Sequence, residues 1–174
     1  MHVSTKMIMP DPSVHSQTQI GHVHLKVADL ERALKFYTEV MGFDLMQRYG
    51  NSAAFVSAGG YHHHIGLNTW ESSNGPQPAR GTTGLYHLAI LYPNRKELAR
   101  AFKRLLDHEW PIDGASDHGV SEAIYLRDPD GNGMEIYHDR PRDQWPKDAS
   151  GGLAMVTEPI DFESLLAELT SHVS

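Results

Sequence analysis

The sequence predicts an α+β fold of two βαβββ modules, which form a curved, partly open mixed-sheet barrel around a cleft. Three observations predict it. Short segments alternate between apolar and polar residues with the period of a strand. A capped, amphipathic helix pattern follows the first strand of each half. The segment "IGHVHLKVAD" from Ile20 is matched in pattern by "GLYHLAILYPN" from Gly84, which indicates an internal structural duplication.

The first module is predicted over residues 19–70, after a flexible N-terminal arm over residues 1–18 that is polar and without periodicity. Its first strand, 20–27, places Val23 and Leu25 on one face and His22 on the other. Asp29 can cap the following helix and Gly42 can end it. The remaining strands of this module are expected at 43–49, 52–58 and 61–68.

The second module is predicted over residues 83–140, after a linker at 71–82 that is rich in Gly, Pro and Ser. Asn94 and Glu97 have the spacing of a capping box before an apolar helical stripe. Strands are expected at 85–92, 111–117, 120–127 and 133–138. The tail, 141–174, ends in "DFESLLAELTSHV", which predicts a short helix.

Composition limits the possible functions. The 174 residues carry a net charge of −7 with no basic run, so nucleic acid is not an expected partner. No apolar run approaches the roughly 20 residues of a membrane span, and no signal peptide is evident. Cysteine is absent, which excludes disulfides and thiolate chemistry, and a cytoplasmic location is expected.

Two histidines and one carboxylate are expected to converge on the cleft. Alternation turns His22 away from the apolar, helix-facing side of its strand, and His87 holds the same position in the second module. Glu135 lies between Met134 and Ile136, which face the other way. Two histidines and a carboxylate suit a divalent metal that keeps open coordination positions. For each histidine alone, a packing or surface role is the ordinary alternative.

The segments "GHVHLKVADLERALKFYTEVMGF" and "YLRDPDGNGMEIY" resemble the vicinal oxygen chelate superfamily, which includes glyoxalase I, fosfomycin-resistance transferases, bleomycin-binding proteins and extradiol dioxygenases. The resemblance covers residues 19–140 and implies paired βαβββ modules around a metal cleft, with His22, His87 and Glu135 as ligands. A glyoxalase I would have a carboxylate near Ile65 or Gly66, and this chain has none.

Within that superfamily, the chain looks most like catechol 2,3-dioxygenase-like proteins. The resemblance implies a catalytic tyrosine ten residues before the glutamate ligand, which is Tyr125. It also implies an acid–base histidine in the "HHHIGL" strand. Family alignment selects His63, whereas strand alternation turns His63 toward the helix and His64 toward the cleft, so both stay candidates. His118 is a further candidate from a nearby loop.

These residues imply an extradiol-type dioxygenase that cleaves a catechol-like ring with O₂, with Fe(II) as the expected metal and Mn(II), Zn(II), Ni(II) or Co(II) as alternatives. The family often pairs such units, so a homodimer is expected. One alternative is a fosfomycin-type thiol transferase, although His24 stands where that class has threonine. The other alternative is a non-enzymatic module that binds an aromatic ligand.

Overall fold

The computed structural model describes residues 14–170, and the α+β fold of two βαβββ modules is confirmed. Most of the expected N-terminal arm, residues 1–13, and the last four residues of the tail lie outside this range. The first module contains β1 (Val23–Lys26), α1 (Leu30–Lys35), the π-helical η1 (Phe36–Val40), β2 (Asp44–Tyr49), β3 (Ala53–Ser57) and β4 (Ile65–Asn68). The second contains β5 (Leu88–Leu91), α2 (Arg95–Asp107), β6 (Ile112–Asp117), β7 (Ser121–Arg127) and β8 (Gly133–Asp139), followed by η2 (Arg142–Gln144) and α3 (Phe162–Ala167).

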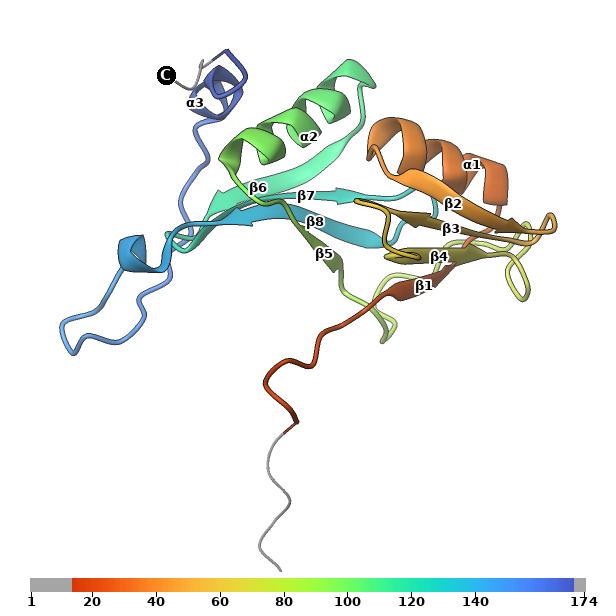
Figure 1. The fold of residues 1–174 in the computed structure, drawn as a ribbon, viewed down its shortest axis with the longest axis horizontal. Coiled ribbons are helices and arrows are strands. Elements are labelled where there is room, and N and C mark those ends of the chain that lie inside the picture. Colours follow the sequence, from red (N-terminus) through yellow and green to blue (C-terminus); the bar gives the residue numbers. More distant parts are fainter. Residues whose placement is uncertain (1–13, 171–174) are drawn as a thin grey trace, which may run out of the picture.

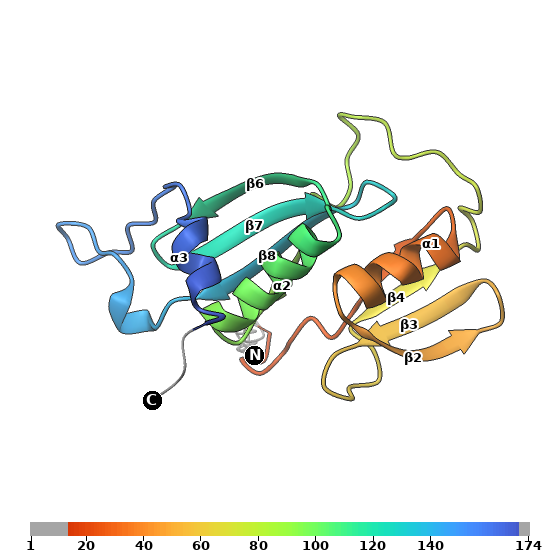
Figure 2. The ribbon, with the colours of Figure 1, turned by 90° about the horizontal axis from the view of Figure 1, so that it is seen from above.

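The two modules have the same sheet topology. The strand orders are β1-β4-β3-β2 and β5-β8-β7-β6, with one parallel pair in each, β1 with β4 and β5 with β8. The two four-stranded sheets stay separate and are not closed into a barrel. Both α1 and α2 lie on the same side of the strands (Figures 1 and 2). The opposite faces of the two sheets, which carry no helix within residues 14–170, are called the open face below.

Side-chain caps fix where the helices begin. The Asp29 carboxylate accepts the Arg32 amide at 3.0 Å, and the Asn94 side chain accepts the Glu97 amide at 3.0 Å. The predicted N-caps are therefore in place, but the Glu97 carboxylate forms an ion pair with Arg100. The first helix pattern is α-helical only to Lys35 and continues as η1, before Gly42 ends it with φ +82°.

A mostly buried polar cluster joins the modules where the β7–β8 turn meets α1. The Tyr37 hydroxyl donates to Asp128 at 3.1 Å, and the Ala28 amide donates to Asp130 at 3.1 Å. Arg32 also donates to Asp130. We call these five residues the inter-module cluster. Beside it, a shared apolar core covers the helix sides of both sheets, so the modules pack as one body.

Within residues 14–170, no helix combines the length and the apolar character that crossing a membrane requires.

Candidate functional site

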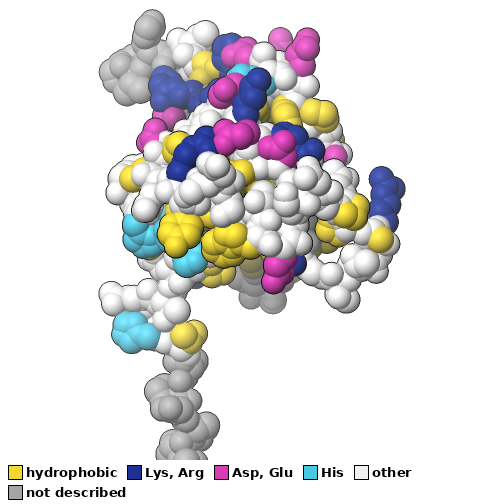
Figure 3. Space-filling view, turned by 90° about the vertical axis from the view of Figure 1, so that its right-hand side faces the viewer, with side chains coloured by type: hydrophobic (Ala, Val, Ile, Leu, Met, Phe, Trp, Pro, Cys, Tyr) yellow, Lys and Arg dark blue, Asp and Glu magenta, His cyan; other side chains and the backbone are white. Residues whose placement is uncertain are grey.

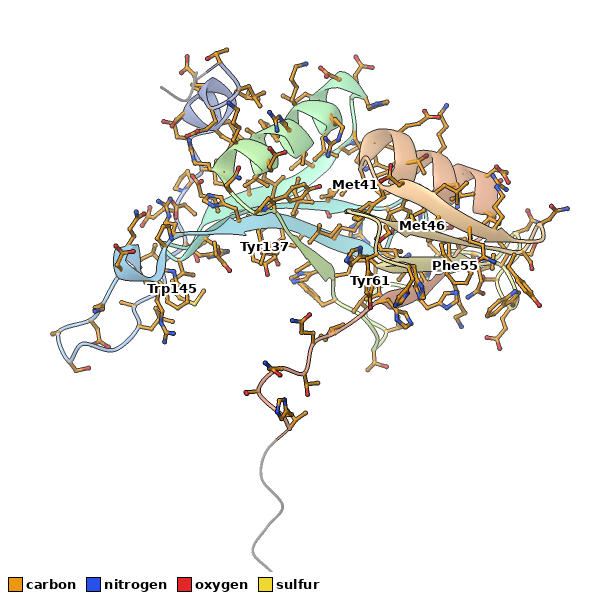
Figure 4. The ribbon with its side chains drawn as sticks, in the orientation of Figure 1. Met41, Met46, Phe55, Tyr61, Tyr137 and Trp145 are labelled. Carbon is orange, nitrogen blue, oxygen red and sulfur yellow. The ribbon has the colours of Figure 1, made fainter. Side chains whose placement is uncertain are left out.

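The open face carries histidine, tyrosine and acidic side chains. Gly114, Tyr125 and Glu135 are Cα partners across β6, β7 and β8, and partner residues on neighbouring strands point to the same side. Tyr137 follows two residues later on β8 and lies below the strands with Tyr61 of the first module (Figure 4). Seen from the end of the first module, most of the charged side chains gather toward the helices, whereas most of the visible histidines lie toward the opposite edge (Figure 3).

His87 and Glu135 form the closest pair of candidate ligands. His87 stands immediately before β5, which pairs with β8, and its Nε2 lies 3.0 Å from Glu135 Oε2. Two ligands about 2.1 Å from one metal and at right angles to each other would have donor atoms about 3.0 Å apart. Their side chains are 32% and 14% exposed, so the pair is shielded but reachable. The chemistry and spacing of this pair fit two adjacent positions on a divalent metal.

Tyr125 and His118 are linked beside that pair. His118 Nε2 lies 2.9 Å from the Tyr125 hydroxyl, and His118 Nδ1 lies 3.0 Å from the Val156 carbonyl. A carbonyl only accepts, so Nδ1 donates, and in the neutral imidazole Nε2 accepts the Tyr125 proton. Burial and the Glu135 charge raise the pKa of Tyr125. The hydroxyl is therefore protonated at neutral pH, and the two residues form a directed proton path.

His22 and His63 contact each other on the first sheet. Their ring centroids are 4.4 Å apart, and the His63 ring lies 5.0 Å from that of Phe55. Gly66 on β4 lies between two Cα partners, Phe55 on β3 and His24 on β1. Burial and the nearby His22 lower the pKa of His63. This favours the neutral imidazole that a general base requires.

The conflict between alternation and family alignment at His63 has a structural cause. The expected strand 61–68 begins only at Ile65, so strand alternation does not extend back to His63. The His63 ring lies against His22, and its assignment as the acid–base residue stays a prediction. His64 is held differently, because its Nδ1 lies 2.8 Å from the Ser57 hydroxyl and its ring packs on Tyr61.

The structure brings the candidate residues together in two groups. His87, Glu135, Tyr125 and His118 form one group on the second sheet, and His22 with His63 forms another on the first sheet. Among residues 14–170, no three His, Asp or Glu side chains are arranged to hold one metal ion. The expected metal cleft, with His22 beside the other two ligands, is therefore not assembled in this structure.

A pocket of about 460 Å³ adjoins the group on the second sheet. It lies in the size range of small-molecule sites, roughly 300–1,000 Å³. Its lining includes His87 and Tyr125 together with Tyr86, Asp113, Gly114, Leu126, Arg127, Gly133 and Met134.

Sequence reasoning missed several residues that shape this region. The Val156 carbonyl acts through the backbone, so its side chain gave no signal. The tail reaches His118 because Asp117 and Glu158 exchange two backbone hydrogen bonds. Gly114 carried a usable signal, since a glycine inside a strand pattern often marks a bulge or a close approach.

The fold and the open-face residues together define a protein of two βαβββ modules with a histidine- and carboxylate-lined face. The family model described as "Glyoxalase/Bleomycin resistance protein/Dioxygenase superfamily" matches residues 19–136. The chain belongs to this superfamily, which the resemblance of its motifs had implied.

Two curated relatives are similar to this chain in sequence. The chain is 45% identical over 157 residues to "Catechol-2,3-dioxygenase" of Bacillus subtilis, covering 90% of this chain and 54% of that protein. It is 30% identical over 123 residues to "Metapyrocatechase" of Geobacillus stearothermophilus, covering 68% and 34%. This chain thus spans about half or less of the length of these relatives. A glyoxalase/dioxygenase structure from Nostoc punctiforme matches the fold with a TM-score of 0.61 at 19% identity, covering 77% of this chain and 99% of that one.

Proposed function

We propose that this protein is a metal-dependent extradiol-type dioxygenase, which opens the ring of a catechol-like diol with O₂. The observation that carries the proposal is the His87–Glu135 pair beside the directed Tyr125–His118 contact on the open face. The name of its Bacillus subtilis relative, "Catechol-2,3-dioxygenase", supports it.

The proposed ligands are His22, His87 and Glu135, with Fe(II) as the first choice and Mn(II), Zn(II), Ni(II) or Co(II) as alternatives. His87 and Glu135 have the spacing of adjacent ligands, and the proposal requires the His22 edge of the first sheet to approach them. The bound metal would supply a site for the two diol oxygens and would lower the pKa of the diol hydroxyls.

The chain's own residues would manage the protons. We assign His63 as the base that takes a diol proton, because its ring contacts His22 and its pKa is lowered. His64 is the alternative base, and its Nδ1 is already in hydrogen-bond contact with the Ser57 hydroxyl. The Tyr125 oxygen would accept a proton from a substrate hydroxyl while the Tyr125 proton passes to His118 Nε2, and the reverse transfer would return a proton to the substrate.

The decisive experiment measures oxygen uptake. Metal-free protein is loaded anaerobically with each candidate metal and mixed with a panel of catechols before O₂ is admitted. The expected result is stoichiometric uptake with a ring-opened product, lost in His87→Ala and kept in His108→Ala, an exposed histidine at the end of α2. Metal binding without uptake across the panel would contradict the proposal. It would favour thiol transfer or simple aromatic binding, which are then assayed directly.

The role of His22 is tested by metal affinity, independent of turnover. We expect His22→Ala to weaken binding of the activating metal by at least about tenfold, because one of three ligands is lost. His24→Ala is the matched control, since His24 lies two residues further along the same open face. Equal affinities for the two variants would remove His22 from the ligand set.

A homodimer in the cytoplasm stays a prediction. Light scattering of the purified protein tests the dimer, and a monomeric mass at micromolar concentration would contradict it.

A further inference from the structure

Gly114 occupies an unusual position on the open face. It lies on β6 as the Cα partner of Tyr125 and lines the pocket beside His87. A Cβ atom built on Gly114 would meet no atom within 4 Å. The pocket therefore owes part of its free space to the missing side chain of Gly114.

The backbone does not explain this glycine. Positive φ is the usual reason for glycine, but Gly114 is not among the residues with positive φ. The other described glycines with equally free space all have positive φ, namely Gly50, Gly59, Gly60, Gly81, Gly84 and Gly151. The pairing of β6 with β7 shifts register between Ile112 and Gly114. An alanine side chain would also fit at position 114. Neither a left-handed conformation nor close packing demands glycine here.

The charge of the pocket indicates what the free space accepts. Arg127 is the only Lys or Arg among the lining residues that the structure describes. Its Nε lies 2.9 Å from Asp113 Oδ2, and its Nη1 donates to the Gly131 carbonyl at 3.0 Å. Asp113 also lines the pocket and offsets the charge of Arg127, so these two residues together give the pocket no net positive charge for an anionic group.

We propose that Gly114 determines substrate size, by leaving room beside Tyr125 for a bulky, uncharged substituent on the ring of the diol. This inference rests on the proposed function, because it assumes that the diol itself binds next to His87 and Glu135. The substrate class is then an aryl- or alkyl-substituted catechol rather than a carboxylated one.

Anaerobic calorimetry tests this without turnover. Metal-loaded protein is titrated with catechol, 3-phenylcatechol and 2,3-dihydroxybenzoate. We expect the wild type to bind 3-phenylcatechol most tightly, because the phenyl group is buried in the pocket. In Gly114→Leu, affinity for 3-phenylcatechol should fall by more than about tenfold relative to catechol, which corresponds to losing burial of an aromatic ring. Ser116→Leu adds the same side chain two residues along β6, outside the pocket lining, and should keep the wild-type ratio.

The outcomes separate this inference from the proposed function. An unchanged affinity ratio in a folded Gly114→Leu protein, or tighter binding of 2,3-dihydroxybenzoate than of 3-phenylcatechol, overturns the role of Gly114 alone. Binding of none of the diols overturns both proposals. If Gly114→Leu does not fold, Gly114→Ala carries the test. In Gly114→Ala, the affinity for 3-phenylcatechol should fall about threefold relative to the affinity for catechol. An unchanged affinity ratio in this variant would overturn the inference.

Discussion

Replacing Glu122 with glutamine tests the buried charges between α2 and the second sheet. Glu122 lies on β7 with a side chain only 5% exposed, and its carboxylate is 2.7 Å from both Arg95 Nε and His138 Nε2. Burial alone would raise the pKa of Glu122, but hydrogen bonds from His138 and Arg95 outweigh it and lower the pKa from 4.5 to about 2. The ionised carboxylate therefore stabilises the folded protein.

The size and the pH window of this effect follow from the two pKa values. The difference of about 2.5, at about 1.4 kcal/mol for each pH unit, corresponds to about 3 kcal/mol. The folded-state pKa is the lower one, so this stabilisation is complete above about pH 4.5 and is lost as the pH falls toward 2. Glutamine does not ionise, so the variant lacks this part of the pH dependence.

The measurement is urea unfolding of both proteins between pH 7 and pH 3. We expect Glu122→Gln to be less stable by about 3 kcal/mol at pH 7, and the gap to shrink to about 1.4 kcal/mol at pH 3. Glu97→Gln is the control, because Glu97 pairs with Arg100 near the surface of α2 and such pairs contribute about 0–1 kcal/mol. A gap that stays constant from pH 7 to pH 3 would refute the reasoning.

Three further substitutions have defined expectations. Gly66→Ala should lower the free energy of unfolding by about 1–3 kcal/mol in urea, because its Cβ would lie 2.9 Å from the His24 ring; a neutral effect would show that the ring moves freely. Gly114→Ala should raise the free energy of unfolding by about 0.4–1 kcal/mol, because alanine restricts the unfolded chain. A lower free energy of unfolding would mean that the added methyl group meets other atoms. Tyr125→Phe should lower kcat on a catechol by about 100-fold with little change in KM. A wild-type rate would remove Tyr125 from the proton path.

Local chemistry explains which parts of the fold the sequence could predict. The Asp29 and Asn94 caps and the turn at Gly42 depend on residues within one helix turn, so short-range patterns were sufficient. The last strand of the first module was predicted over 61–68, but β4 begins only at Ile65. The pattern of side chains does not reveal where a strand begins. Alternation holds only inside a paired strand, so it does not fix the side to which His63 points.

The candidate site was less predictable because its parts come from segments far apart in the chain. The pairing of Glu135 with His87 follows from β5 lying beside β8, which the repeat implied. The contact of His118 with the Val156 carbonyl depends on where the tail returns after Arg140, and no residue pattern encodes that return. The separation of His22 from Glu135 depends on how two sheets are oriented, which each module's sequence leaves open.

The inter-module cluster bears on how His22 would reach the second sheet. It binds Ala28 and the start of α1 to the turn at Asp128 and Asp130, so that end of the first sheet is held in place. His22 lies six residues before Ala28, about 20 Å away along an extended strand. The shared apolar core also packs the two modules as one body, so bringing His22 to Glu135 would require contacts of that core to rearrange. The metal affinity of His22→Ala therefore tests directly whether His22 belongs to the ligand set.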